Sequence, residues 1–151
     1  MIIAITGHRT ILESDLAVID ERVHALLDQE DLSEVLIGGA LGVDLHVLNY
    51  MLRWRQRDTP KITVVVPNTV GHQPLSTQPM IHMADAVVEL NVPITPRDGF
   101  QAYHVRNRYM VDRSTNVLAF FNGDERSGTS STMHYARRCS KAVEVVGLRK
   151  P

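Results

Sequence analysis

The chain has 151 residues, 44% of them hydrophobic, which is the size and composition of one ordinary globular domain. Sixteen basic and seventeen acidic side chains give a formal net charge of -1, and this balance argues against nucleic acid as a partner, because such partners normally need a basic surface. A single cysteine, Cys139, excludes an internal disulfide, and no apolar run reaches the ~18 residues of a membrane span, so we expect one cytoplasmic domain over residues 1–151.

Short apolar runs alternate with helical patterns along the chain. The apolar runs, rich in β-branched residues, predict strands over 2–6, 34–39, 61–67, 86–90, 116–121 and 142–147. Apolar steps of three and four predict helices over 16–26, 45–52, 103–114 and 129–139, with a shorter one within 72–85. Ser14 is placed to cap the first of these helices. Loops are expected around the prolines and glycines at Pro67 to Pro79, Pro93, Pro96 and Gly99.

This alternation of strands and helices predicts a parallel arrangement. Strand–helix–strand units are right-handed and build a sheet that helices cover on both faces. An α+β fold would need antiparallel hairpins, and their turn signals are missing except at Asn122-Gly123. We therefore predict an α/β fold, a single Rossmann-like three-layer domain with a mainly parallel sheet.

Three glycine-bearing segments follow predicted strands and lead into predicted helices. They read TGHRT from Thr6, GGALGVD from Gly38 and GDERSGTSST from Gly123. A helix start with glycine offers backbone N–H groups to phosphate, and a Cβ at Gly42 would block close approach of the anion. Taken singly, each segment is more often a turn than a ligand site, and a residue such as Asp44 is more often a helix cap. Together, at the carboxyl edge of one parallel sheet, they predict a nucleotide-type cradle.

Charged and polar side chains near these segments complete the candidate site. Arg9 and Arg106 are natural partners for phosphate oxygens, because a guanidinium matches their geometry. His8 has three open interpretations: it donates to phosphate, stacks on a base or lines the loop. The spacings are neither G-x-G-x-x-G nor G-K-[ST], and one cysteine with scattered histidines predicts no metal and no cofactor. No serine or cysteine lies in a nucleophile motif.

The same segments resemble those of the SLOG superfamily of Rossmann-like nucleotide-binding proteins, and they are most similar to its YpsA-like branch. The resemblance is carried by IAITGHR from Ile3, GGALGVDLHVLN from Gly38, the middle region from Pro67 to Leu90, and RNRYMVDRSTNVLAFFNG from Arg106. The superfamily also includes the cytokinin-activating phosphoribohydrolases and the DNA-processing protein A family. It implies binding of a nucleotide or a nucleotide-derived ligand.

The segments and the resemblance together give a set of candidate ligand-binding residues. Its members are Thr6, Gly7, His8, Arg9, Gly38, Gly39, Gly42, Asp44, Arg106, Asn107, Ser127, Gly128 and Thr129. The phosphoribohydrolases carry Pro-Gly-Gly-x-Gly-Thr-x-x-Glu in the last loop. This chain reads DERSGTSST there and has Thr132 in place of the glutamate, so we expect little hydrolase activity.

Three functions follow from this reasoning, and the chain is expected not to be an enzyme. The first is a sensor, carrier or sequestering module for a small nucleotide, such as an ADP-ribose-like or cyclic signalling molecule. The second is a nucleotide phosphoribohydrolase that takes its acid from Asp44, Asp124 or Glu125. The third is a DNA-binding accessory protein, against which the neutral charge argues. Members of the superfamily commonly form dimers, so the resemblance also implies a homo-oligomer, a dimer whose subunits contact each other through the helix at 103–114.

Overall fold

The computed structural model describes residues 1–93 and 99–151, and the loop predicted at Pro96 lies outside them. The described strands form one six-stranded sheet in the order β4-β3-β2-β1-β5-β6, and every neighbouring pair is parallel. These strands are β1 (Ile2–Gly7), β2 (Glu34–Ile37), β3 (Lys61–Val66), β4 (Ala86–Glu89), β5 (Asn116–Phe121) and β6 (Ala142–Gly147). The predicted α/β three-layer fold with a parallel sheet is confirmed.

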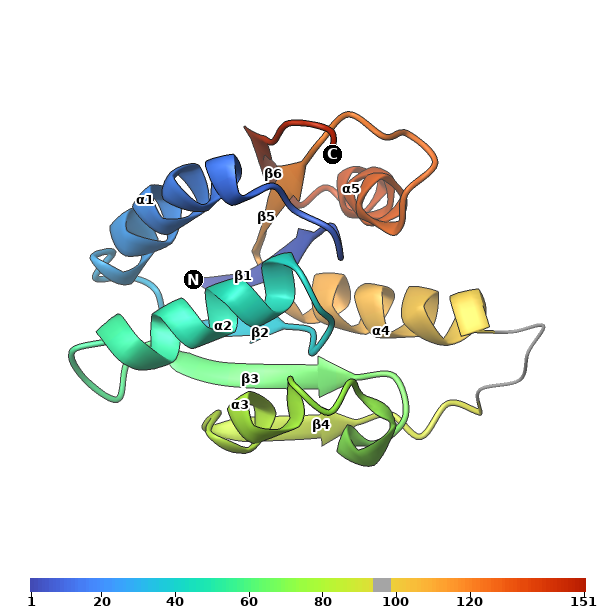
Figure 1. Cartoon of the computed structure of the whole chain (residues 1–151), viewed down its shortest axis with the longest axis horizontal. Helices are drawn as coiled ribbons and strands as arrows, with labels where there is room; N and C mark the ends of the chain where they lie inside the picture. The colour runs from blue at the N-terminus through green and yellow to red at the C-terminus, as the bar shows by residue number, and fades with distance from the viewer. Residues whose placement is uncertain (94–98) are drawn as a thin grey trace.

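Five α-helices cover the two faces of this sheet (Figure 1). They are α1 (Leu16–Leu27), α2 (Val43–Trp54), α3 (Gln78–His82), α4 (Gly99–Arg113) and α5 (Gly128–Arg138), and the short 3-10 turns η1 (Glu13–Asp15) and η2 (Val70–His72) accompany them. Helices α1, α2 and α3 contribute to one buried cluster, and α4 and α5 contribute to the other. No helix in the described part of the chain has the length and apolar character needed to cross a membrane.

The alternation of side chains along the strands assigns each residue to one of these two cores. In β1, Ile3 and Ile5 face the α1–α2 side, whereas Ala4 between them faces α4 and α5. The first core is large and aliphatic; the second is small and includes Met110 and Ala136 from its two helices. The α4–α5 layer therefore gives less of its surface to the core and keeps more of it for polar side chains.

The cap of the first helix and the start of the fourth differ from the predictions. Helix α1 follows the 3-10 turn η1, its N-cap position is Asp15, and no side-chain hydrogen bond caps it, so the capping role predicted for Ser14 is wrong. Helix α4 begins at Gly99, four residues before the predicted start at Tyr103. The first turn of α4 carries little apolar periodicity, and apolar periodicity was the signal used for the prediction.

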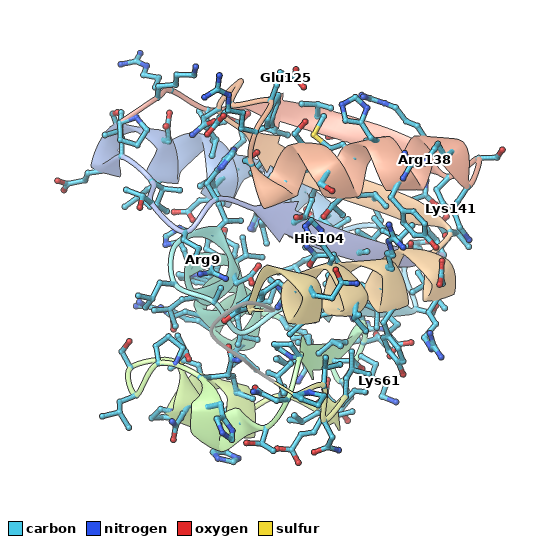
Figure 2. The ribbon with its side chains drawn as sticks, turned by 90° about the vertical axis from the view of Figure 1, so that its right-hand side faces the viewer. Arg9, Lys61, His104, Glu125, Arg138 and Lys141 are labelled. Carbon is cyan, nitrogen blue, oxygen red and sulfur yellow. The ribbon has the colours of Figure 1, made fainter. Side chains whose placement is uncertain are left out.

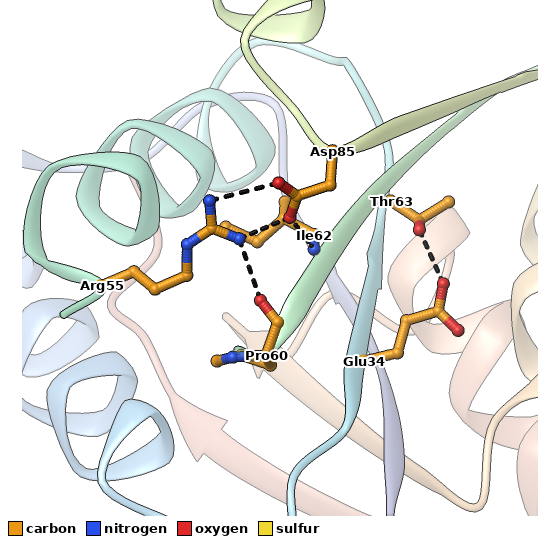
Figure 3. A network of polar contacts seen from close by, with 6 residues as sticks. All are labelled: Glu34, Arg55, Pro60, Ile62, Thr63 and Asp85. Carbon is orange, nitrogen blue, oxygen red and sulfur yellow. Dashed lines mark hydrogen bonds and ion pairs between the residues drawn. The ribbon is translucent and has the colours of Figure 1, made fainter. Parts of the chain in front are cut away.

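At the amino ends of β3 and β4, a polar network joins helix α2 to the sheet (Figure 3). Arg55, just after α2, donates to the carbonyl of Pro60 at 3.0 Å and forms an ion pair with Asp85. The Ile62 N–H donates to the same Asp85 carboxylate at 2.7 Å. These bonds lower the pKa of Asp85, the Arg55 hydrogen bond contributing most. The network ties helix α2 to the amino ends of two strands, at the edge of the sheet opposite its carboxyl end.

The strand order reverses direction between β1 and β5. From β1 the chain winds outward through β2 and β3 to β4. Helix α4 then forms the connection from β4 to β5, which lies on the other side of β1. In open parallel sheets, ligands bind beyond the carboxyl ends of the strands at such a reversal. The fold therefore places a crevice between the loops that follow β1 and β5.

Candidate functional site

A cleft of about 750 Å³ lies at this reversal, between the loops after β1, β2 and β5 and the inner side of α4. Its volume falls in the range of small-molecule sites. Eleven of the candidate residues line it: Thr6, Gly7, His8, Arg9, Gly38, Asp44, Arg106, Asn107, Ser127, Gly128 and Thr129. Residues from four segments far apart in the sequence therefore converge on one space. Their role in binding a ligand stays a prediction.

Gly39 and Gly42 do not line the cleft. A Cβ at Gly39 would lie 2.6 Å from Cδ1 of Ile81, against α3. Gly42 has a φ of +80°, and its Cβ would lie 2.3 Å from the carbonyl oxygen of His8, so it provides room for the neighbouring loop's backbone rather than for an anion. The Val43 N–H donates to the same His8 carbonyl at 3.0 Å, which holds the first two loops together. The structure therefore gives Gly42 a packing role between two loops, and its predicted contact with phosphate stays a prediction.

A buried charge pair forms the floor of the cleft. The Arg106 side chain extends from α4 under the loop after β2, is 7% exposed, and donates from Nε to Asn107 at 2.8 Å. Asp44, 6% exposed, accepts from the Ala40 N–H at 3.2 Å. Burial raises the pKa of Asp44 and lowers that of Arg106, while each charge partly counteracts this shift in the other. Asp44 is thus a partner of Arg106 rather than a helix cap.

Gly38 makes this pairing possible. A Cβ there would lie 2.1 Å from Nη1 of Arg106 and 2.5 Å from Oδ2 of Asp44. Both side chains therefore occupy the space that any other residue at this position would fill. The glycine pair after β2 was predicted to serve an anion directly, and at Gly38 it instead admits the arginine.

Arg9 crosses from the loop after β1 to helix α4. Its guanidinium lies 4.2 Å from the centre of the Tyr103 ring, and the guanidinium of Arg106 lies 5.4 Å from the same ring. Arg9 is exposed, so its charge faces the cleft mouth rather than the protein interior. The pair of arginines about one aromatic ring gives the cleft a cationic, flat wall.

His8 joins the loops after β1 and β5. Its Nε2 accepts a hydrogen bond from the Asn122 N–H at 3.0 Å, and its ring stacks on Phe121 with 5.8 Å between centroids. A ring nitrogen that accepts in this way carries no proton, so the imidazole is neutral. Burial lowers the His8 pKa accordingly, and nearby Asp124 opposes this shift. Of the three interpretations of His8, the structure favours the residue that lines and holds the loop.

The loop after β5 ends in a capped helix start. The Ser127 hydroxyl accepts from the Ser130 N–H at 3.1 Å, which caps α5. In the described part of the chain, no hydrogen bond is found for the N–H groups of Gly128 and Thr129, which line the cleft. No atom lies within 4 Å of the space a Gly128 Cβ would take, so a ligand can approach the backbone there.

Thr132, which replaces the hydrolase glutamate, is buried and donates to the Gly128 carbonyl at 2.8 Å. It is absent from the described lining of the cleft. The carboxylate on this wall is Glu125, which accepts from the Ser130 hydroxyl at 2.9 Å and pairs with His134. The expected lack of phosphoribohydrolase activity stays a prediction.

Sequence reasoning missed several residues of the cleft wall. Tyr103 and Met110 line it with Arg106, at steps of three and four on one side of α4, and His134 lies seven residues after Ser127 on α5. Helical spacing from a residue already chosen would have found them. The glycine pattern alone indicated only the loops.

Charge is segregated between the two helical layers. Helices α4 and α5 carry one aspartate, Asp112, and five arginines, which are Arg106, Arg108, Arg113, Arg137 and Arg138. On the other face, η1, α1 and α2 carry two arginines and five carboxylates, which are Glu13, Asp15, Asp20, Glu21 and Asp44, the last of them at the cleft beside Arg106. The net charge of -1 therefore conceals a basic layer beside the cleft.

Comparison with known proteins shows similarity in structure without a match in sequence. No family model matches the chain, and no curated protein matches it. One similar solved structure is DNA processing protein A from Helicobacter pylori, described for its single-stranded DNA binding mode. The two superimpose with a TM-score of 0.73 at 20% identity, over 99% of this chain and 66% of the other. The fold of this chain is therefore that of DNA processing protein A, and the chain spans under two thirds of that protein's length.

This comparison corrects one expectation. The neutral net charge was taken as an argument against nucleic acid, yet a protein with the same fold binds single-stranded DNA. The argument failed because a net charge sums over all faces, whereas binding depends on one face. Membership of the SLOG superfamily and its YpsA-like branch stays a prediction, as does the homodimer.

Proposed function

We propose that the chain binds single-stranded DNA, with one nucleotide of the strand held in the cleft at the end of β1 and β5. The observation that carries the proposal is the convergence of Arg9, Arg106 and the backbone N–H groups of Gly128 and Thr129 on one space. Guanidinium groups and free backbone N–H groups at a helix start are the usual partners of phosphate. DNA processing protein A from Helicobacter pylori, whose structure is similar, binds single-stranded DNA, and this similarity favours a nucleic acid as the source of that phosphate.

The cleft wall also suits a nucleobase. The Tyr103 ring lies beside the Arg9 guanidinium, and both face the cleft. Aromatic rings and arginine planes hold bases by stacking, which does not depend on sequence. A strand entering this cleft would place its phosphate toward α5 and its base toward α4.

A free nucleotide is the second candidate, supported by the volume of the cleft. About 750 Å³ accommodates a whole small ligand, and the buried Arg106 lies at its floor. A sensor or carrier of a nucleotide-derived molecule, as the SLOG resemblance implies, would use the same side chains. The YpsA-like relationship belongs with this second candidate.

The two candidates separate in one titration series. Anisotropy of a labelled oligothymidylate measures binding of the strand, and calorimetry measures binding of nucleoside mono- and diphosphates. We expect strand binding that the Arg9→Ala variant weakens roughly 10- to 150-fold, as expected from the loss of one charge-assisted bond. Arg53→Ala removes an arginine that lies beside Trp54 at the other end of α2, and it is the matched control. Nucleotide binding without strand binding would replace the proposal with the second candidate.

A further inference from the structure

Outside the cleft, basic and aromatic side chains gather on the outer side of α4 and α5. We call this group the α4–α5 patch; it consists of Arg108, Arg113, Arg138, Lys141, Tyr109 and Tyr135. Figure 2 shows Arg138 and Lys141 together at one end of these helices, with Arg9 beyond the other end. The patch and the cleft therefore lie toward opposite ends of helices α4 and α5.

The members of the patch contact one another across the two helices. The guanidinium groups of Arg108 and Arg138 lie 5.0 and 5.9 Å from the centre of the Tyr135 ring, and that of Arg113 lies 3.5 Å from the centre of Tyr109. The Tyr135 hydroxyl donates to Asp112 at 2.6 Å, and this bond raises the Tyr135 pKa to about 12. The two rings are thus held in place with arginines beside them.

Among the described residues these charges have few polar partners, one of which is the Tyr109 carbonyl that accepts from Arg113 at 3.4 Å. In the part of the chain that the structure describes, Arg108, Arg113 and Arg138 form no ion pair with a carboxylate, and all three are exposed. Lys141 donates to the Ser114 carbonyl at the end of α4, which accounts for one of the four cations. Positive charge near helix C-termini is favourable by itself, but that accounts for Arg113 and Arg138 rather than for Arg108 in the middle of α4.

We propose that the α4–α5 patch is a second contact surface for the phosphate backbone of the single-stranded nucleic acid whose nucleotide enters the cleft. The inference rests on the proposed function and extends it, because it assigns the path of the strand outside the cleft. Exposed arginines next to aromatic rings bind single strands, the charges following the backbone and the rings stacking with bases. The basic layer, five arginines against one aspartate, has the charge that a polyanion requires.

The geometry sets the length of strand that uses both surfaces. Tyr103 at the cleft and Arg113 in the patch are ten residues apart on one helix, or about 15 Å at 1.5 Å per residue. The spacing along a duplex strand, about 3.4 Å per nucleotide, is a lower limit for an extended single strand, so this distance corresponds to at most about four nucleotides. A dinucleotide is therefore too short to use both surfaces, whereas a strand of about twelve nucleotides is long enough to reach the patch from the cleft.

The test compares these two lengths in the double variant Arg108→Ala/Arg138→Ala. Two lost phosphate contacts lower the salt slope by about 1.4, at about 0.7 per contact, which reduces the twelve-nucleotide affinity roughly 25-fold at about 0.1 M salt. Dinucleotide affinity, measured by competition, stays unchanged. The control Arg53→Ala/Arg57→Ala removes two arginines near the amino edge and should leave both affinities as in the wild type.

Four results would overturn the inference. An unchanged affinity and salt slope for the long strand, while Arg9→Ala still weakens binding, would remove the patch and leave the proposed function standing. An equal loss in the control variant would show that only net charge matters. Retention of the wild type, but not the patch variant, on phosphatidylserine vesicles with unchanged strand binding would assign the patch to a membrane surface. No strand binding at all by the wild type would end both proposals.

Discussion

At the scale of single residues, the cleft depends on an arginine that the protein interior surrounds. Arg106 reaches the cleft floor through the space that Gly38 leaves, and Asp44 lies against it. Removing one partner of a buried charge pair leaves the other uncompensated, which costs more than the pair contributes. Variants that disturb Arg106 therefore affect folding as well as binding, and a change at the glycine that admits it should do both as well.

Gly38→Ala tests this arrangement. The new Cβ would lie within 2.5 Å of both Arg106 and Asp44, and such overpacking lowers the free energy of unfolding by about 1–3 kcal/mol. Strand binding should weaken in parallel, because Arg106 is displaced. Urea unfolding measures the first effect. Gly128→Ala is the matched control, since nothing lies within 4 Å of its Cβ, and it should not lower stability. Wild-type stability in Gly38→Ala would mean that the Arg106 and Asp44 side chains move aside at no cost, and it would contradict this prediction.

His8 gives a second prediction at this scale, on pH. Burial lowers its pKa below the usual 6.5, with Asp124 opposing the shift, and the hydrogen bond that the ring accepts from the Asn122 N–H needs the same neutral form. With the pKa lowered in the folded state, the stabilisation is complete above pH 6.5 and is lost as pH falls through the folded value. An NMR titration of the imidazole signals measures the His8 pKa. The signal that is missing in the His8→Asn variant is assigned to His8. A His8 midpoint above 6.5 would contradict the hydrogen bond.

At the scale of elements, α2 links the two edges of the sheet. Its first turn contains Asp44 at the cleft, and beyond its last turn Arg55 forms the ion pair with Asp85 between β3 and β4. The Asp85 carboxylate also accepts the Ile62 N–H, so one side chain fixes the relative positions of a helix and two strands. This contact is a structural one, at the edge opposite the cleft.

Asp85→Asn should make this contact measurable through acid unfolding. The Asp85 pKa is lowered chiefly by Arg55, so its stabilisation is complete above the usual 3.8 and is lost as pH falls through the folded value. Near neutral pH the variant should be less stable by about 1 kcal/mol, the upper range for such exposed pairs. The difference should disappear in acid. Asp58→Asn, an exposed position close by, should match the wild type throughout. A constant difference at every pH would contradict this account.

At the scale of the whole molecule, the two helical layers differ in sign. A chain with a net charge of -1 and a pI near 6.6 is slightly anionic as a whole at pH 7, yet it presents a basic layer on the α4–α5 side. A polyanion contacts one layer at a time, so its binding follows the local charge.

Retention on a heparin column near pH 7 follows from this segregation. The wild type should bind although its net charge is slightly negative, and Arg108→Ala/Arg138→Ala should elute at clearly lower salt. The control Arg53→Ala/Arg57→Ala changes the net charge by the same amount and should elute with the wild type. Passage of the wild type without retention would show that the basic layer is too weak to act.

The sequence predicted the strands well because each is a short apolar run rich in β-branched residues, and the four central strands are buried between two layers, whereas the edge strands β4 and β6 are partly exposed. The topology followed from the alternation of strands with helices. Residues of the cleft were found where a glycine or a strand end marked them, as with Gly38 and Arg9. Tyr103 was missed because nothing in its neighbourhood marks a loop. The close packing of Gly42 against the His8 and Arg9 carbonyls could not be predicted, because a sequence does not show which way a Cα faces.

Charge was misjudged for a related reason. Arg108 on α4 and Arg138 on α5 are thirty residues apart, and only the fold shows that both lie beside Tyr135. The acidic side chains that balance them lie mostly on the opposite layer and on exposed loops. A sum over the sequence cannot distinguish this arrangement from an even mixture.

The parallel sheet also affects how fast the protein should associate with a polyanion. Each helix that follows a strand begins at the carboxyl edge, so α2, α4 and α5 all direct their amino-terminal ends there. Aligned peptide groups make each helix a macrodipole with about half a positive charge at that end. These dipoles add to the basic layer and give the molecule a field that turns the cleft toward an approaching polyanion. The association rate should therefore fall with salt more steeply than the dissociation rate rises, as electrostatic steering requires.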